Sequence, residues 1–241
     1  MIDIFSRRPL KLFALGAACA VLGGLGGGLG LLAIQGWRGD RMVHDYIVSH
    51  PEVLPEAMDN LHRQEESKQL AGIRGDLERP WPGAVLGNPN GKQTLVEFTD
   101  FACSFCRRSI ADIDLLIASR PELKVVVREL PILTQQSNDA AKMALAAAAQ
   151  GRYAAFHKAM FAIGHPDAAT IAQAAATAGL DMTRARATIA DLGTEAEIER
   201  NLEFARKLGL SGTPSWVAGD RLLSGAVGVD RLAQALDGVK G

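Results

Sequence analysis

The sequence predicts an α/β fold in which one small sheet is completed across a long helical insertion. Two short apolar runs, residues 94–99 and 124–130, flank a stretch with helical periodicity. That order is typical of a strand–helix–strand unit with two parallel strands. An Ala-rich helical block follows over residues 137–208, and two more short apolar runs and a last helix come after it. The chain is therefore expected to return to its sheet after the insertion.

Residues 1–37 have the composition of a signal anchor or a signal peptide. Residues 12–37 contain no charged side chain, and three basic residues precede them. A bilayer span needs about 20 apolar residues, and a basic flank favours a cytoplasmic N-terminus with the rest of the chain exported. We expect residues 12–36, if uncleaved, to anchor the chain at the inner membrane with its C-terminal domain in the periplasm. Small residues around Cys19 also fit a cleaved signal peptide, and no role is assigned to Cys19.

Residues 38–79 have the pattern of an amphipathic helical arm that ends in a linker rich in glycine and proline. Apolar residues recur at helical spacing, and Pro51 and Pro55 interrupt the pattern. Two helices joined near His50 are therefore expected in place of one continuous rod. An amphipathic arm can self-associate, so residues 40–75 are a candidate for forming a homo-oligomer.

The main domain is expected over residues 80–241, with the helical insertion at about 133–208. A turn at residues 88–91 precedes the first strand, and a helix after that strand is expected to end near Ser119, because Pro121 follows. Within the insertion we expect N-caps at Asp167 and Asp181, a capping box formed by Thr194 and Glu197, and a C-cap at Gly209. The last elements are expected as strands at 215–218 and 221–224 and a helix at 230–237.

The charge balance excludes nucleic acid as the main partner. The chain carries 26 basic and 27 acidic residues, and only 5% of its residues are aromatic. Phosphate binding needs a clustered basic surface, and base stacking needs aromatic platforms. The sequence offers neither, so no nucleic-acid partner is predicted.

Cys103 and Cys106 lie where the first strand gives way to a helix. Unpaired N–H groups and the macrodipole at a helix N-terminus favour an anion, so the Cys103 thiolate should form more readily than that of a free cysteine. Arg107 adds positive charge beside the pair. An exposed thiolate at Cys103 could attack a disulfide in another protein, and Cys106, one turn along, could resolve the mixed disulfide.

Other uses of the cysteine pair are weaker. A structural disulfide is disfavoured, because so short a loop removes only about 2 kcal/mol of unfolded-chain entropy. A structural zinc site needs two more ligands, and His157 and His165 lack the usual spacing, so no metal site is predicted. Two buried and inert cysteines remain an alternative. So does a pair of thiolates that holds a soft ion such as Cu(I).

The string VEFTDFACSFC at residues 96–106 resembles the DsbA-like branch of the thioredoxin superfamily, where a strand with an acidic residue precedes CxxC. That family also has a helical insertion and a late cis-proline loop. Here residues 137–208 and the sequence Gly-Thr-Pro at 212–214 match these features in the same order. The resemblance covers roughly residue 83 to the C-terminus, and it implies a thioredoxin-like fold with an inserted α-helical domain.

The resemblance implies a role for each matching residue. Cys103 would be the nucleophile, and Cys106 the resolving thiol. Glu97 would be the buried carboxylate that exchanges protons with the deeper thiol, unless it is an edge-strand carboxylate in solvent. Pro214 would be cis, with the Thr213 backbone set to pair with an extended substrate strand, unless it is an ordinary trans proline. No cofactor beyond the redox-active Cys103–Cys106 disulfide is implied.

The residues between the cysteines depart from the family's strong oxidases. Ser104 and Phe105 stand where those oxidases have Pro-His, so the thiolate should be less stabilised and the pair less oxidising. Thr213 before the proline looks more like isomerase and reductase members. We therefore expect an exported protein disulfide isomerase or reductase rather than a strong oxidase. Its partners would be cysteine-containing exported proteins and a membrane thiol–disulfide redox protein. The alternative is a periplasmic copper-binding or chaperone-like protein that uses the pair as a metal site.

Overall fold

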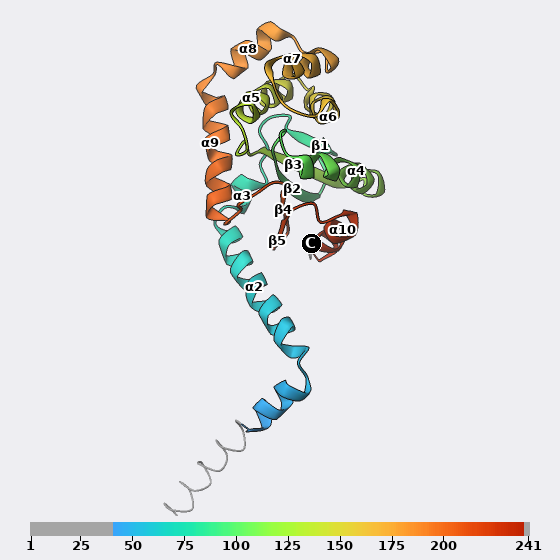
Figure 1. Ribbon diagram of the computed structural model, residues 1–241, viewed down its shortest axis with the longest axis vertical. Helices are drawn as coiled ribbons and strands as arrows, with labels where there is room; N and C mark the ends of the chain where they lie inside the picture. Colours follow the sequence, from blue (N-terminus) through green and yellow to red (C-terminus); the bar gives the residue numbers. More distant parts are fainter. Residues whose placement is uncertain (1–40, 239–241) are drawn as a thin grey trace, which may run out of the picture. The chain divides into compact units, whose positions relative to one another are not determined.

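The computed structural model describes residues 41–238, and Figure 1 shows the arrangement of the elements. The helices are α2 (Val53–Ala71), α3 (Arg74–Leu77), α4 (Ser104–Ser119), α5 (Gln135–Ala149), α6 (Tyr153–Ile163), α7 (Ala168–Thr177), α8 (Met182–Ile189), α9 (Leu192–Lys207) and α10 (Val229–Asp237). The strands are β1 (Val85–Gly87), β2 (Gln93–Thr99), β3 (Leu123–Glu129), β4 (Ser215–Ala218) and β5 (Arg221–Ser224).

The predicted membrane anchor cannot be judged from this structure. Residues 1–37, with Cys19, lie outside the described residues. Between residues 41 and 238, no helix combines the length and the apolar character that a bilayer span requires.

The described strands form one five-stranded sheet in the order β1-β3-β2-β4-β5. β2 and β3 run parallel, and α4 connects them, which confirms the strand–helix–strand unit predicted from the two apolar runs. β4 returns after the helical insertion and pairs antiparallel with β2, and β5 completes a hairpin with β4. β1 was not predicted, because its three residues are too short for an alternating pattern.

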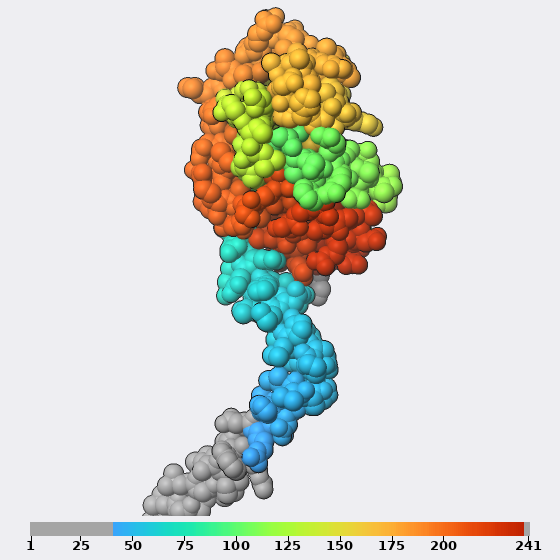
Figure 2. All heavy atoms as spheres, in the orientation of Figure 1, coloured from blue at the N-terminus to red at the C-terminus, as the bar shows by residue number. Residues whose placement is uncertain are grey.

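The two faces of the central strands bury different side chains. Leu95, Val125 and Val127 belong to the larger core, which also contains residues of α4 and of the helical insertion. Val96 and Val126 belong to a second core, shared with α3 and α9. Because side chains alternate along a strand, Glu97, Thr99 and Glu129 fall on the face of the larger core. α10 lies beside α4 and packs on that face over β2 and β4 (Figures 1 and 2).

The predicted caps of the helical insertion are confirmed with one exception. Asp167 and Asp181 cap α7 and α8, and Gly209, with φ of 66°, follows the end of α9. The prediction of a capping box formed by Thr194 and Glu197 is wrong. Asp191 starts α9 earlier by accepting the N–H of Gly193, which leaves both expected partners inside the helix. The Thr194 hydroxyl donates instead to the Thr188 carbonyl, and Glu197 pairs with Arg128.

The arm has the two helices that its prolines predicted. Residues 41–49 are helical, the helix breaks over 50–52, and α2 follows. The chain divides into two compact units between Asn60 and Leu61. Residues 61–79, expected as arm and linker, belong to the second unit, and α3 forms inside the expected linker.

Candidate active site

Cys103 is the N-cap residue of α4, at the junction that the sequence predicted. Its backbone is extended, with φ of −81° and ψ of 117°, and its sulfur accepts a hydrogen bond from the backbone N–H of Cys106 at 3.4 Å. A cap in this position points the sulfur at the unpaired N–H groups of the first helical turn. The Cys103 sulfur therefore occupies the place where a helix N-terminus best accommodates an anion.

Both cysteine side chains are buried, which corrects the expectation that Cys103 is exposed. Cys103 is 5% exposed, and Cys106 is fully buried. The cover over Cys103 comes from the loop before β4, where the thiol donates a hydrogen bond to the Thr213 carbonyl at 3.1 Å. The next peptide bond, Thr213–Pro214, is cis, so the alternative of a trans proline is wrong. The structure thus brings the two cysteines together with Thr213 and Pro214, although the cysteine pair and the Thr-Pro pair are more than 100 residues apart in the sequence.

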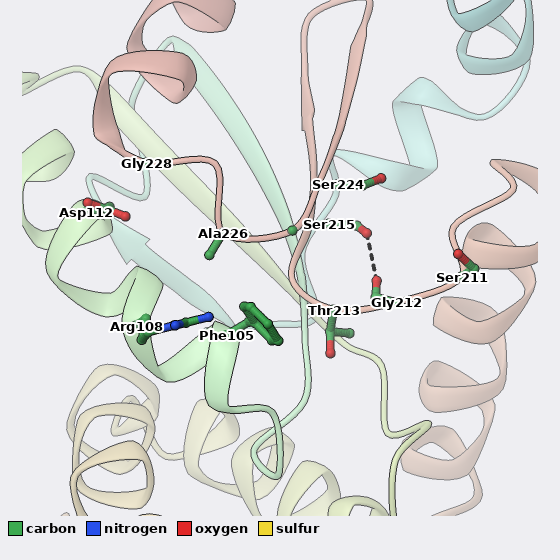
Figure 3. Close-up of a pocket in the computed structure, with 11 residues that line it drawn as sticks. Phe105, Arg108, Asp112, Ser211, Gly212, Thr213, Ser215, Ser224, Ala226 and Gly228 are labelled. Atoms are coloured by element: carbon green, nitrogen blue, oxygen red, sulfur yellow. Dashed lines mark hydrogen bonds between the residues drawn. The ribbon is translucent and has the colours of Figure 1, made fainter.

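A pocket of about 580 Å³ opens beside this junction (Figure 3). The first turns of α4, the loop at Thr213 and the loop between β5 and α10 form its walls. Phe105 is half exposed on the α4 side, and the Arg108 guanidinium lies over its ring, 4.2 Å from the centroid. On the opposite wall the Ser215 hydroxyl donates to the Gly212 carbonyl. Asp112 and several small residues line the rest of the pocket, which leaves room for an extended chain.

Arg107 does not serve the cysteine pair as expected. Its guanidinium donates to the Gly164 carbonyl just after α6, so the side chain ties α4 to the helical insertion. The neighbouring Arg108 faces the pocket instead (Figure 3). Ser104, the other predicted flanking residue, is exposed on the first turn of α4.

Glu97 is fully buried on the central strand β2, so the alternative of an edge-strand carboxylate in solvent is wrong. Neither carboxylate oxygen has a hydrogen-bond partner of ordinary geometry in the described part of the chain. Burial raises the pKa of Glu97 from 4.5 to about 8, and the nearby Thr99 hydroxyl lowers it by a smaller amount. At neutral pH this carboxyl therefore keeps its proton for most of the time.

Cys106, the deeper thiol, is surrounded by groups that change its pKa in opposite directions. Burial raises the pKa of Cys106 strongly, and the negative charge of Glu97 raises it further. The hydroxyls of Thr99 and Thr213 and the backbone of Asp100 act in the opposite direction. Cys106 is therefore a thiol in the resting site, and forming its thiolate requires that its proton be moved away.

Asp100 is a site residue that the sequence analysis missed. Its Oδ1 atom accepts the N–H of Ala102 at 2.8 Å, and its Oδ2 atom accepts the N–H groups of Ile132 and Leu133 at 2.9 and 3.0 Å. Its carbonyl accepts the N–H of Cys103. Asp100 thus fixes the turn into the cysteines against the loop after β3. The signal was an aspartate directly after a strand, a residue type that often organises turns.

The sequence analysis also missed a buried pair of polar side chains beneath the cysteines, Tyr153 and Glu129. The Tyr153 hydroxyl donates to Glu129 Oε1 at 2.7 Å, and both side chains are buried. Burial raises the pKa of Glu129 well above its usual value, and the charges of Glu97 and Asp100 raise it further. His157, one turn along α6, is buried among the rings of Phe101, Tyr153 and Phe161.

No group of three or more His, Cys, Asp or Glu side chains between residues 41 and 238 could hold a metal ion. His157 and His165, considered above as zinc ligands, lie in different surroundings: His157 is buried, whereas His165 is exposed beside Asp167.

Residues 94–237 match the family of DSBA-like thioredoxin domains. The chain belongs to this family. Residues 40–68 match a second family model, the N-terminal domain of the copper resistance protein ScsC. The predicted resemblance and the thioredoxin-like fold are therefore confirmed, and the arm matches a family of its own.

Solved structures of the family are similar to this chain over most of their length. A thioredoxin-like oxidoreductase from Silicibacter pomeroyi is 39% identical, covers 64% of this chain and 89% of its own, and has a TM-score of 0.61. The thiol-disulfide exchange protein α-DsbA2 from Wolbachia pipientis is 28% identical. The match covers 73% of this chain and 96% of α-DsbA2, with a TM-score of 0.65. ScsC from Proteus mirabilis, in a transitional conformation, is 27% identical. The match covers 85% of this chain and 96% of ScsC, with a TM-score of 0.62.

The curated relatives that this chain matches are much longer proteins. A Na(+)/H(+) antiporter NhaA from Salinispora tropica is 28% identical over 63% of this chain. The chain spans about a quarter of that antiporter's length, 24%.

Proposed function

We propose that this chain is an exported protein thiol–disulfide oxidoreductase in which Cys103 is the nucleophile and Cys106 the resolving thiol. The observation that carries the proposal is the position of the Cys103 sulfur, between the N-terminus of α4 and the Thr213 carbonyl. Family membership and the likeness to a thiol-disulfide exchange protein support it. The only redox group that the reaction requires is the cysteine pair itself.

The first step forms a mixed disulfide. The Cys103 thiolate attacks one sulfur of a substrate disulfide, a new S–S bond forms, and the other substrate sulfur leaves as a thiolate that takes a proton from solvent. The pocket beside Phe105 and Thr213 would hold the substrate chain in an extended form, with its backbone against the loop. The attacking sulfur lies at the N-terminus of α4, where it accepts the backbone N–H of Cys106.

The second step closes the ring between the two cysteines. The Cys106 proton passes to the Glu97 carboxylate, the Cys106 thiolate attacks Cys103, and the substrate sulfur leaves as a thiolate and is protonated. Two electrons have then moved from the cysteine pair to the substrate. In the reverse direction neutral Glu97 returns the proton to Cys106 as the Cys103–Cys106 disulfide opens.

We further propose that the physiological direction is reduction or isomerisation rather than strong oxidation. A strongly oxidising pair needs additional stabilisation of its thiolate. Ser104 and Phe105 provide no imidazole for this purpose, and the Arg107 guanidinium is hydrogen-bonded to Gly164 instead. The substrates would be cysteine-containing exported proteins. A membrane thiol–disulfide protein would return the pair to its working state, and residues 12–36, if uncleaved, would keep the domain at the periplasmic face of the inner membrane.

Three assays of the full chain test the proposal: reduction of insulin, oxidation of reduced ribonuclease and rescue of scrambled ribonuclease. We expect activity in the first and third, and its loss in Cys103→Ser. Cys106→Ser should accumulate a mixed disulfide that can be trapped at Cys103. A wild-type protein inactive in all three assays would refute the enzymatic proposal. Faster oxidation of ribonuclease than rescue would refute the proposed direction.

Copper binding is the second candidate function, and the match of residues 40–68 to the copper resistance protein ScsC is what favours it. Two thiolates at Cys103 and Cys106 suit Cu(I), which is a soft ion. Stoichiometric Cu(I) binding that survives a strong chelator and disappears in Cys103→Ser would support this function. If the same protein showed no exchange activity, copper handling would replace the enzymatic proposal.

We also propose that the arm mediates self-association, which a chaperone-like binding module would use. Within residues 41–60, large apolar side chains are exposed, among them Met42, Val43, Tyr46 and Leu54. Light scattering of the full chain and of a variant that lacks residues 1–60 tests this. Equal masses per chain in the two samples would exclude a role of the arm in association.

A further inference from the structure

Two buried carboxyls lie on one face of the sheet beneath the cysteines. In the parallel register Thr99 faces Glu129 and Val127 faces Glu97, so the two glutamates are diagonal neighbours on adjacent strands. Each is at most 1% exposed. Three of their four oxygens have no hydrogen-bond partner among the described residues, and the fourth accepts the Tyr153 hydroxyl. The mechanism above uses Glu97 and leaves Glu129 without a role.

Among residues 41–238, the groups that face Glu129 include no cation to balance a charge. α6 contributes the Tyr153 hydroxyl and, one turn further, His157. Burial lowers the pKa of His157 to about 4, so this ring is neutral under physiological conditions. The end of β2 contributes the carboxylates of Glu97 and Asp100, both of which oppose a charge on Glu129. Arg128 precedes Glu129 in the chain, but it extends to Glu197 in the second core.

Two acids that share a buried site without a cation do not ionise independently. The first negative charge opposes the second, and the protons then belong to the pair rather than to either residue. The Tyr153 hydroxyl favours a charge on Glu129, whereas burial and the charges of Glu97 and Asp100 oppose it. When Glu129 carries the charge, Glu97 keeps its proton, and it cannot accept another from Cys106.

We propose that Glu129, held by Tyr153, is a positioning residue for the Cys106 step: the two buried carboxyls share one negative charge, and Glu129 thereby sets the pH at which Glu97 can take the Cys106 proton. This inference rests on the proposed exchange function. In this proposal Glu129 acts through Glu97 and not on the sulfurs themselves. The step itself is unchanged: one proton moves from the Cys106 thiol to the Glu97 carboxylate, and no electrons move until the thiolate attacks Cys103.

The test combines a titration with a rate measurement on the full chain. Carboxyl ¹³C signals of labelled glutamate, assigned with Glu97→Gln and Glu129→Gln, report ionisation of each group in the reduced protein. Ring closure from the mixed disulfide between Cys103 and glutathione reports the Cys106 step as a function of pH. In Glu129→Gln we expect the midpoint of the Glu97 signal and the rise in the closure rate to move together to lower pH, by about one pH unit. Tyr153→Phe should move both in the same direction by less.

Glu197→Gln is the matched control, because Glu197 is another buried carboxyl but lies in the second core against Arg128. It should leave both midpoints where they are in the wild type. The proposal is overturned if Glu129→Gln leaves the Glu97 signal unmoved while the protein stays folded, or if Glu197→Gln produces the same shift. If the cysteines form no disulfide with glutathione, the exchange function fails, and the ¹³C titration still shows whether the carboxyls are coupled.

Discussion

The two sulfur atoms of the site are one helical turn apart, and their surroundings differ. Cys103 caps α4 beside the pocket, whereas Cys106 is fully buried above Glu97. Burial and the Glu97 charge both raise the pKa of Cys106, so little thiolate forms there. The arrangement suits the proposed roles, in which Cys103 attacks and Cys106 stays a thiol until its proton is removed.

This difference predicts selective alkylation of the reduced protein. Iodoacetamide should modify Cys103 at least about tenfold faster than Cys106 at neutral pH, because only a thiolate reacts and Cys106 is also screened from reagent. Mass spectrometry of Cys103→Ser and Cys106→Ser measures the two rates separately. Equal rates in the folded variants would contradict the assignment of nucleophile and resolving thiol.

Glu97 should destabilise the reduced protein as the pH rises. Burial raises its pKa from an ordinary value of 4.5, which applies to the unfolded chain, to about 8 in the folded state. Between these values the folded state binds more protons than the unfolded chain, so the free energy of unfolding falls as the pH increases through that window. Glu97→Gln should therefore be more stable than the wild type by about 3 kcal/mol near pH 7.

Urea unfolding of the reduced proteins at several pH values measures this effect. The gain from Glu97→Gln should shrink as the pH falls towards 4.5, where the carboxyl is protonated in both states. Glu197→Gln is the control, because it removes the charge partner of a buried arginine and should be destabilising. A stabilisation by Glu97→Gln that does not depend on pH would rule out ionisation of the carboxyl as its cause.

Residues near the cysteines in sequence were easier to predict than residues that meet them in space. Cys103, Cys106 and Glu97 share one continuous string, and the loop at Thr213 has a recognisable Thr-Pro pair. Glu129 and Tyr153 belong to separate elements and become neighbours only when β3 and α6 pack together. The burial of Cys103 was misjudged for the same reason, since a loop 110 residues away covers it.

At the scale of elements, Arg128 fastens α3 to the sheet. This fully buried side chain on β3 donates to the carbonyls of Asp76, Leu77 and Arg79 at the end of α3. It also donates to Glu197 on α9 at 2.5 Å. One guanidinium therefore satisfies the C-terminal carbonyls of a short helix that has no other strong reason to form.

Arg128→Met should cost about 3–5 kcal/mol of stability, because it leaves the buried Glu197 with only the half-exposed Arg200 as a charge partner and strips the α3 carbonyls of their donor. Arg128→Lys keeps the charge but lacks the planar fork that reaches several acceptors, so it should recover only part of the loss. Urea unfolding measures both variants. A loss below about 1 kcal/mol in Arg128→Met would show that α3 is held by its apolar contacts instead.

Elements with strong periodic signals were predicted, and elements made by tertiary contacts were not. The bounds of α4, β2 and β3 follow from apolar runs and from Pro121. β1 and α3 are short and depend on partners elsewhere, namely β3 for the first and Arg128 for the second. The misplaced start of α9 shows the limit of cap motifs, since Asp191 and Thr194 both qualify and only the packed helix distinguishes them.

At the scale of the whole molecule, the composition predicted an arm that ends in a linker, whereas the compact units divide between Asn60 and Leu61. Glycines and prolines between residues 72 and 83 predicted a linker. Leu70 and Leu77 are nevertheless fully buried in the second core, and Glu66 on α2 accepts the N–H of Leu222 on β5. The compact unit therefore begins inside α2, because apolar burial outweighs the local preference of a glycine-rich stretch for a loop.

Two truncations distinguish these boundaries. A variant that lacks residues 1–60 keeps every contact of the second unit and should match the full chain in unfolding free energy and in exchange activity. A variant that lacks residues 1–79 loses both buried leucines, worth about 2 kcal/mol each, and exposes the side of Arg128 that α3 covers. It should be less stable by at least about 4 kcal/mol, as measured by urea unfolding. Equal stability of the two variants would place the start of the folding unit at residue 80, as the glycines and prolines suggested, and would mean that α3 contributes nothing to the stability of the sheet.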